Sequence, residues 1–282
     1  MAKTAGVVLV GGRSSRMGTS KAALEWHGST LLRRVTGIVS RSVDGPVVVV
    51  RAPGQPLPIL PTRIEVLDDP AEGRGPLQGI AVALAALADR AGTAFVCSTD
   101  LPLLHPAFVR RVTREAQAVA VDVVLPVVGG HRQPLTACYR TRLAAAAARL
   151  MTADQLRPAL LFDGAAVVQL DEQTLPADPA LRRADPDLDS VTGVNTPAEY
   201  QALRARPAPT VTVQRVGVLA SGGARGDRTV CAATLAGAAD AVGLTLDHHV
   251  RAALNGEELA RDPELPLATG DVVAFRAADA GG

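Results

Sequence analysis

The chain has 282 residues, of which 48% are hydrophobic and 2% aromatic, and its 29 basic and 28 acidic residues leave a formal net charge of +1. Such a composition can build a sizeable core from Ala, Val and Leu, while the balanced charge argues against nucleic acid or a membrane surface as the main partner. No apolar run approaches membrane-spanning length, and Cys97, Cys138 and Cys231 have neither disulfide-framework nor zinc-site spacing. We therefore expect a soluble, cytoplasmic protein with free thiols.

Short apolar runs alternate with longer helical patterns from residue 6 to residue 200. The runs expected to be strands covered on both faces are Gly6–Val10, Pro46–Arg51, Arg63–Leu67, Thr93–Ser98 and Val121–Pro126. The first expected helices are Ser29–Arg41, with Ser29 as its N-cap, Pro76–Arg90 and His105–Val119. This alternation predicts an α/β fold of Rossmann-like type, with a mostly parallel sheet and helices on both faces.

The pattern changes after residue 127. The next expected elements are a hairpin in Pro126–Arg140, helical stretches Thr141–Leu150 and Ala153–Phe162, a strand Ala165–Leu170, a surface loop Asp171–Ser190 and a helix starting near Thr196. A proline-rich linker, Arg206–Thr210, then separates a domain of residues 1–206 from one of residues 207–282. In the second domain we expect strands Thr210–Leu219 and Gly270–Ala278, a strand and a turn within His249–Leu259, and a helix Arg228–Gly243.

A loop rich in glycine and cations follows the first expected strand and reads G-G-R-S-S-R-M-G-T-S-K from Gly11 to Lys21. Its glycines leave main-chain N–H groups open to an anion, and Arg13, Arg16 and Lys21 add positive charge, so the loop can cradle a triphosphate. The pattern is neither G-x-x-x-x-G-K-[ST] nor G-x-G-x-x-G. A strand–helix corner with solvated arginines is the simpler alternative.

Asp100 follows the apolar strand Thr93–Ser98, with Thr99 between them. It is therefore expected at the carboxyl edge of a parallel sheet, where α/β proteins bind their ligands. A carboxylate there is well placed to hold Mg²⁺. Capping of the helix that follows is the alternative role.

Five motifs, spread in order from residue 11 to residue 200, resemble those of the molybdenum cofactor guanylyltransferase family. They are the loop Gly11–Lys21, D-D-P-A-E-G-R-G-P-L-Q-G at Asp68–Gly79, S-T-D-L-P-L-L at Ser98–Leu104, R-Q-P-L-T-A-C-Y at Arg132–Tyr139 and V-N-T-P-A-E-Y at Val194–Tyr200. The chain departs from the family pattern at Ser20, where Asp is usual, at Val10, where Ala is usual, and at Gly193, where Asn is common.

The resemblance implies transfer of GMP from GTP to molybdopterin, with release of pyrophosphate and with Mg²⁺ as cofactor. The residues it implies as catalytic are Arg16, Lys21 and Asp100, the last also holding the metal. Those implied to bind the nucleotide are Leu9, Val10, Gly11, Gly12, Arg13, Lys21, Arg51, Asp69 and Asp100, with Asp69 reading guanine and Asp68 as its alternative. Those implied to bind the pterin are Gly75, Gly79 and Asn195, for which helix-start turns and a simple N-cap are the alternatives.

The C-terminal part resembles the ubiquitin-like small sulfur carriers of molybdopterin and thiamine synthesis. The resemblance rests on A-L-N-G-E-E-L at Ala253–Leu259, on L-P-L-A-T-G-D-V-V-A-F at Leu265–Phe275 and on the terminal Gly281 and Gly282. It implies a β-grasp domain whose tail carries sulfur, or docks an adenylating or synthase protein of the molybdopterin pathway. A degenerate β-grasp domain without that role is the alternative.

Three functions stay open at this point. The first is guanylyl transfer to molybdopterin. The second is cytidylyl transfer to the same pterin, or nucleotidyl transfer to a sugar or isoprenoid phosphate. The third, from a different class, is a carrier or interaction protein that keeps a nucleotide-binding relic.

Overall fold

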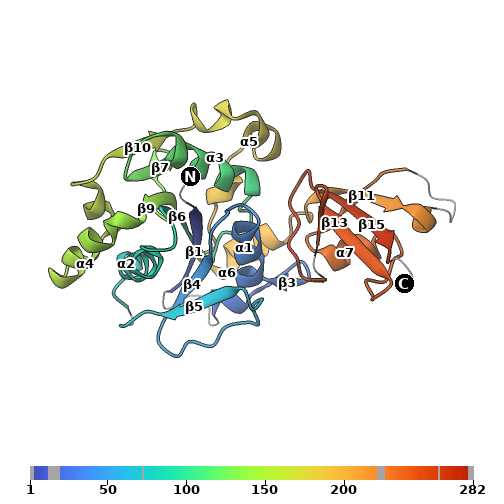
Figure 1. Ribbon diagram of the computed structural model, residues 1–282, viewed down its shortest axis with the longest axis horizontal. Helices are drawn as coiled ribbons and strands as arrows, with labels where there is room; N and C mark the ends of the chain where they lie inside the picture. The colour runs from blue at the N-terminus through green and yellow to red at the C-terminus, as the bar shows by residue number, and fades with distance from the viewer. Residues whose placement is uncertain (1–2, 12–19, 72, 221–225, 260, 279–282) are drawn as a thin grey trace. The chain divides into compact units, whose positions relative to one another are not determined.

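The computed structural model describes residues 3–11, 20–71, 73–220, 226–259 and 261–278 (Figure 1). The chain folds as two compact units, and the second is made of two separate stretches of sequence. The first unit comprises Met1–Leu24 and Leu31–Pro197, and the second comprises Glu25–Thr30 and Ala198–Gly282. In the part of the chain that the structure describes, no helix has the length and apolarity needed to cross a membrane.

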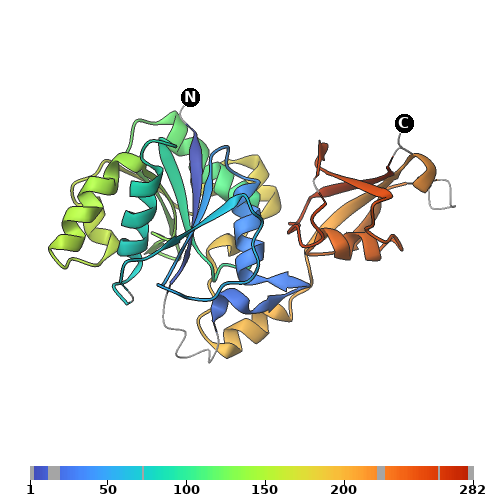
Figure 2. The same ribbon diagram turned by 60° about the horizontal axis from the view of Figure 1, so that its bottom comes forward.

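An eight-stranded sheet forms the centre of the first unit (Figure 2). Its order is β10-β7-β9-β6-β1-β4-β5, with β8 paired to β7. The strands are β1 Thr4–Val10, β4 Val47–Arg51, β5 Ile64–Asp68, β6 Thr93–Ser98, β7 Val123–Val128, β8 His131–Arg132, β9 Thr136–Arg140 and β10 Val167–Leu170. Strands β6, β1, β4 and β5 are parallel neighbours, whereas β9 pairs antiparallel with both β6 and β7. The mostly parallel sheet predicted from the apolar runs is thus confirmed.

Helices cover both faces of this sheet. Successive residues of β1 point to opposite faces. Gly6 lies against Val39 of one helix, and Leu9 packs against Gly79 of another. The helices of this unit are α1 Leu31–Ser40, α2 Pro76–Leu87, α3 Pro106–Ala118, α4 Ala144–Thr152 and α5 Pro179–Ala184, with α6 Pro197–Arg204 beginning at the boundary between the units. β1 is buried along its whole length, and so its apolar residues do not alternate with polar ones.

The second unit has its own five-stranded sheet, in the order β12-β11-β15-β13-β14. Its elements are β11 Thr210–Val216, β12 Arg228–Cys231, α7 Leu235–Asp240, β13 Val250–Leu254, β14 Glu257–Glu258 and β15 Val272–Ala277. Strands β11 and β15 are parallel, and the other pairs are antiparallel. Leu235 and Ala238 of α7 join Val213 and Phe275 of the sheet in one apolar core.

A short hairpin also belongs to the second unit, which the sequence pattern did not anticipate. Its strands are β2 Glu25–Trp26 and β3 Ser29–Thr30. Within this unit the Ser29 hydroxyl donates to Glu264 Oε2 at 3.1 Å, and Arg204 Nε donates to Glu25 Oε2 at 2.7 Å. These long-range bonds explain why the stretch is grouped with residues that follow the expected linker.

Three local expectations need correction. Ser29 is not an N-cap, because it lies in β3 and its hydroxyl is bonded to Glu264. The expected helix Arg228–Gly243 begins as strand β12, whose pairing with β11 overrides its helical pattern, and only α7 is helical, capped by Thr234. The expected loop Asp171–Ser190 contains α5, which is capped by Asp178 and buries Leu181.

Candidate active site

The carboxyl ends of four parallel strands meet at one edge of the main sheet. Register sets Val10 beside Arg51, and Arg51 beside Asp68, at the ends of β1, β4 and β5. On the other side of β1, Leu9 pairs with Ser98 at the end of β6. The polar residues that follow these strands are therefore brought together, as expected for an α/β ligand site.

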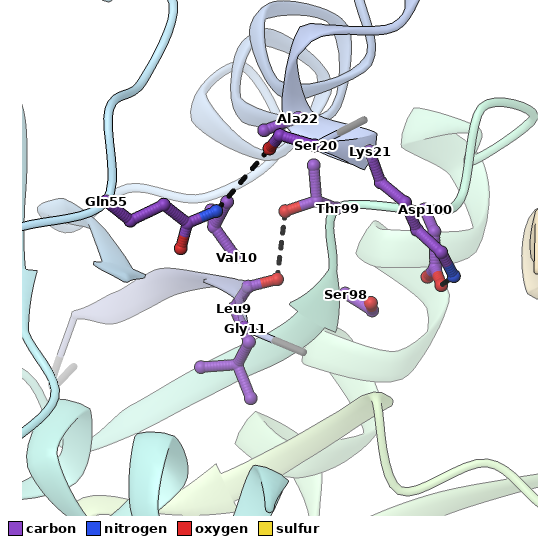
Figure 3. Close-up of a pocket in the computed structure, with 10 residues that line it drawn as sticks. All are labelled: Leu9, Val10, Gly11, Ser20, Lys21, Ala22, Gln55, Ser98, Thr99 and Asp100. Carbon is purple, nitrogen blue, oxygen red and sulfur yellow. Dashed lines mark hydrogen bonds and ion pairs between the residues drawn. The ribbon is translucent and has the colours of Figure 1, made fainter. Parts of the chain in front are cut away.

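A cavity of ≈ 100 Å³ opens at this edge, between the ends of β1 and β6 (Figure 3). Its lining residues are Leu9, Val10, Gly11, Ser20, Lys21, Ala22, Gln55, Ser98, Thr99 and Asp100. Sites for small-molecule ligands usually exceed about 300 Å³. A cavity of this volume suits a part of a nucleotide, such as a phosphate group.

Thr99 fixes the direction in which the chain leaves β1. Its N–H and its hydroxyl both donate to the Leu9 carbonyl, at 3.1 Å and 2.9 Å. The side chain is buried, so the bond from its hydroxyl is shielded from competing water. These two hydrogen bonds join the ends of β1 and β6 close to Gly11 and Asp100.

Lys21 lies between two oxygen donors that come from distant parts of the chain. Its Nζ donates to Asp100 Oδ2 at 2.7 Å and to Asn195 Oδ1 at 3.0 Å. The side chains of Lys21 and Asp100 are 23% and 19% exposed. The two loops that carry the oxygens are joined as well, since Val194 N–H donates to the Asp100 carbonyl at 2.9 Å. The site thus holds a positive group between a carboxylate and an amide oxygen.

Gln55 lies on the opposite side of the end of β1 from Lys21 (Figure 3). Its Nε2 donates to the Ser20 hydroxyl at 3.5 Å, and its Oε1 accepts from Ala52 N–H at 3.2 Å. Arg51 holds this loop, because its guanidinium donates to the Gln55 carbonyl at 3.0 Å and to Asp68 Oδ1 at 2.7 Å. Arg51 is therefore a support for the cavity and does not line it.

Asp69 directly follows β5, and its main-chain N–H donates to the Arg51 carbonyl at 2.8 Å. Its Oδ1 accepts from Ala71 N–H at 3.2 Å and from the side chain of Gln78, a buried residue of α2. Burial raises the pKa of the Asp69 carboxyl, while the Ala71 N–H and the positive charge of Arg74 act in the opposite direction.

The two glycines expected near the pterin have local structural reasons. Gly75 precedes α2 with φ of 80°, a conformation that favours glycine. At Gly79, an added Cβ would lie 3.1 Å from Cδ2 of Leu9, so glycine allows α2 to approach β1 closely. These reasons account for both glycines at the edge of the site whatever the ligand is.

Part of the expected site lies outside the described residues, namely Gly12, Arg13 and Arg16, as do Gly281 and Gly282 of the tail. Leu9, Val10, Gly11, Lys21 and Asp100 all line the cavity, and Asn195 contacts Lys21. Gln55, Gln78 and Thr99 are among the contributors that sequence reasoning missed. Only Thr99 had a usable signal, as a polar residue at the end of a buried strand.

Among the described residues, no three or more His, Cys, Asp or Glu side chains gather as a metal cluster.

Comparison with known proteins gives a consistent assignment for the larger part of the chain. The model of the MobA-like NTP transferase domain matches residues 6–167. A probable molybdenum cofactor guanylyltransferase of Mycobacterium tuberculosis is 39% identical over 202 residues, which cover 70% of this chain and 92% of the relative. One of Mycobacterium avium is 36% identical over 202 residues, covering 71% and 94%.

A solved structure has the same fold. It is the molybdopterin-guanine dinucleotide biosynthesis protein A of Archaeoglobus fulgidus, with a TM-score of 0.58 at 22% identity, covering 71% of this chain and 96% of that one.

Proposed function

The chain belongs to the MobA-like NTP transferase family and is a nucleotidyltransferase, and from that premise we propose that it transfers GMP from GTP to the terminal phosphate of molybdopterin, releasing pyrophosphate. Relatives that align over 202 residues are named for this reaction. The observation that carries the proposal is the convergence of Lys21, Asp100 and Asn195 beside the end of β1.

The phosphates of the nucleotide bind at the end of β1. Glycine at position 11 leaves the main chain accessible there, and the Lys21 ammonium is within reach of the same cavity. Arg13 and Arg16, which come between Gly11 and Lys21 in the sequence, supply further positive charge. Lys21 exchanges its bond to Asp100 for one to the β- or γ-phosphate, where it stabilises the charge that builds on the leaving pyrophosphate.

Asp100 and Asn195 fit a Mg²⁺ ion. A carboxylate oxygen and an amide oxygen already converge on one positive group, the Lys21 ammonium. Magnesium in nucleotide sites is bound through one or two carboxylates together with substrate phosphates, so a larger cluster of protein ligands is not required. When bound, the ion would neutralise phosphate charge and so favour attack at the α-phosphorus.

The chain needs no general base for this reaction. The attacking phosphate of molybdopterin is already ionised at neutral pH, so catalysis depends on alignment and on charge neutralisation. Asn195, held near Asp100 by the Val194 N–H bond, is positioned to orient the pterin phosphate. Gly75 and Gly79 let the pterin approach the start of α2.

The base binds at the end of β5, where Asp69 reads it. Asp69 and Asp100 follow strands that are three positions apart in the sheet, roughly 14 Å by ordinary strand spacing. A nucleotide that lies along this edge would have its phosphates near β1 and its base near β5. A carboxylate accepts hydrogen bonds from the adjacent N1 and N2 donors of guanine, and cytosine has no matching pair. This supports GTP over CTP.

Pyrophosphate release tests the proposal. Wild-type protein is incubated with Mg²⁺ and each of GTP, CTP, ATP and UTP, with and without molybdopterin. We expect release that depends on molybdopterin, with kcat/KM at least about tenfold higher for GTP than for CTP, because loss of even one net hydrogen bond to the base costs about 1 kcal/mol. Asp69→Asn should lose most of this preference. Faster release with CTP would favour cytidylyl transfer, and no release with GTP would refute the proposal.

A second function is favoured for residues 207–282 by one observation. The strand order is β12-β11-β15-β13-β14, with the parallel pair β11 and β15 at its centre and with α7 packed on the sheet, and this order supports a β-grasp domain. We propose that this part acts as a sulfur carrier or partner-docking module through Gly282. Intact-mass measurement after incubation with a pathway adenylating enzyme, ATP and a sulfur donor tests this. A thiocarboxylate is heavier than the carboxylate, and an unchanged mass would argue for a degenerate domain.

A further inference from the structure

Gln78 is a buried polar residue whose side chain serves another segment of the chain. It is the third residue of α2 and is 4% exposed. A glutamine at this helix position often accepts a hydrogen bond from the N-cap N–H. Here its Nε2 donates to Asp69 Oδ1 and, at 2.8 Å, to the Ala71 carbonyl. Both N–H groups of the amide are therefore directed at the turn that follows β5.

These bonds divide the Asp69 carboxylate into two unlike oxygens. Oδ1 accepts from Gln78 and from Ala71 N–H, which fills the two positions that one carboxylate oxygen offers. Oδ2 is left to a ligand, since the contacts within the described ranges assign it no partner. One oxygen can still accept from both adjacent donors of a guanine edge.

We infer that Gln78 is a positioning residue for base recognition, which holds Asp69 with Oδ1 turned toward α2 and Oδ2 turned toward the nucleotide base. The inference rests on the proposed function. The orientation of the Gln78 amide follows from chemistry, because the reversed amide would set its oxygen against two acceptors, Asp69 Oδ1 and the Ala71 carbonyl. Gln78 thereby also stabilises the ionised form of Asp69, which is the form that accepts hydrogen bonds from a base.

The principal variant is Gln78→Met, which keeps the length and flexibility of the side chain but removes both donors. The matched control is Gln117→Met. Gln117 lies on α3 of the same unit and donates one side-chain bond to Thr4 Oγ1 at 3.0 Å, at the other end of β1. Gln78→Met loses two amide hydrogen bonds at the turn after β5, whereas Gln117→Met loses one bond of an exposed side chain far from Asp69.

Two measurements distinguish positioning from simple stabilisation. In Gln78→Met we expect KM for GTP to rise about tenfold while kcat stays within about twofold, because the base is remote from the reacting phosphates. Carbon-13 NMR of the nucleotide-free protein should show the pKa of Asp69 raised further above that in the wild-type protein, since a bond to the ionised form is lost. The acid limb of kcat/KM should move to higher pH as well. In Gln117→Met none of these quantities should change.

A second variant, Gln78→Glu, keeps the shape of the side chain and sets a second carboxyl group against Asp69. Two such groups can share one proton, so we expect KM for GTP to be high at pH 8 and to recover in part at pH 6. An unchanged KM and an unchanged Asp69 pKa in both variants would overturn the inference. A raised pKa with wild-type KM would also overturn it, since Asp69 would then not read the base. Failure of wild-type protein to use GTP, by contrast, refutes the proposed function itself.

Discussion

Substitution of Lys21 by alanine should have opposite effects on catalysis and on metal binding. In the nucleotide-free protein the Lys21 ammonium lies 2.7 Å from Asp100 Oδ2 and 3.0 Å from Asn195 Oδ1. These are the oxygens proposed to hold Mg²⁺, so the ammonium and the metal compete for one position. With nucleotide bound, the same ammonium is proposed to stabilise the phosphates. Removal of the ammonium therefore frees the metal site and, at the same time, reduces the stabilisation of the transition state.

The size of each effect follows from the geometry. At 2.7 Å and an effective dielectric constant near 20, the Coulomb attraction between Lys21 and Asp100 is roughly 6 kcal/mol. Both side chains are about one-fifth exposed, so desolvation, side-chain entropy and screening reduce the net value to about 1 kcal/mol. Loss of the pair should therefore tighten metal binding about fivefold. Loss of a preorganised charge at the phosphates should lower kcat by about 10²–10³-fold.

Two assays measure these effects separately. Titration of the nucleotide-free protein with Mn²⁺, followed by electron paramagnetic resonance, reports metal affinity, and pyrophosphate release with GTP reports catalysis. The matched control is Lys3→Ala, because Lys3 is the only other lysine in the sequence and its side chain is exposed. The control should leave both quantities at wild-type values.

The reasoning would be refuted by either of two results. If Lys21→Ala binds Mn²⁺ more weakly than wild-type protein, the ammonium does not compete with the ion, and Asp100 and Asn195 are not its ligands. If pyrophosphate release stays within about threefold of wild type, Lys21 does not act on the transferring phosphates.

Three further predictions concern stability and reactivity. Thr99→Val should lower the free energy of unfolding by about 1 kcal/mol in urea titration, because the bond from its hydroxyl to the end of β1 is lost. Burial raises the pKa of Asp185, so its contribution to stability is present below the ordinary aspartate pKa and is lost as pH rises through the raised value. The stability of wild-type protein relative to Asp185→Asn should therefore fall as the pH rises above the ordinary aspartate pKa, and a constant difference would contradict this. Native protein should react with a thiol reagent at Cys231 alone, because Cys231 is exposed and burial raises the pKa of Cys97 and, to about 12, that of Cys138. Labelling of two or more thiols before unfolding would count against it.

The sequence was most informative where a strand is buried on both faces. The run Thr93–Ser98 has no polar alternation, and β6 has the same bounds as the prediction. The antiparallel insertion of β9 between β6 and β7 was not predictable in the same way, because a pairing such as Phe95 with Cys138 is decided by contacts far apart in the chain. The strand at Arg228–Cys231 was missed for that reason also, since its pairing with β11 outweighs the local helical pattern.

Prediction of the site had a similar limit. Asp100 could be chosen because it follows the end of an apolar strand, and Lys21 because it belongs to the loop rich in glycine and cations after the first strand. Their direct contact was not predictable, because 79 residues separate them. Gln55 gives no signal in its proline-rich segment, and Gln78 lies in the motif Gly75–Gly79 without any pattern that points to Asp69. Side chains that support a site through tertiary contacts leave little trace in the local sequence.

The hairpin Glu25–Thr30 has a consequence for the modularity of this gene product. The hairpin is encoded near the start of the chain, yet it is part of the same compact unit as residues 198–282. Ser29 and Glu264, which are joined by a hydrogen bond, lie on opposite sides of the linker Arg206–Thr210 in the sequence. A shortened chain that stops there would expose Ser29 without its partner, and a transplanted C-terminal segment would lack the hairpin. Exchange of the second unit between proteins thus requires two separate stretches of coding sequence to move together.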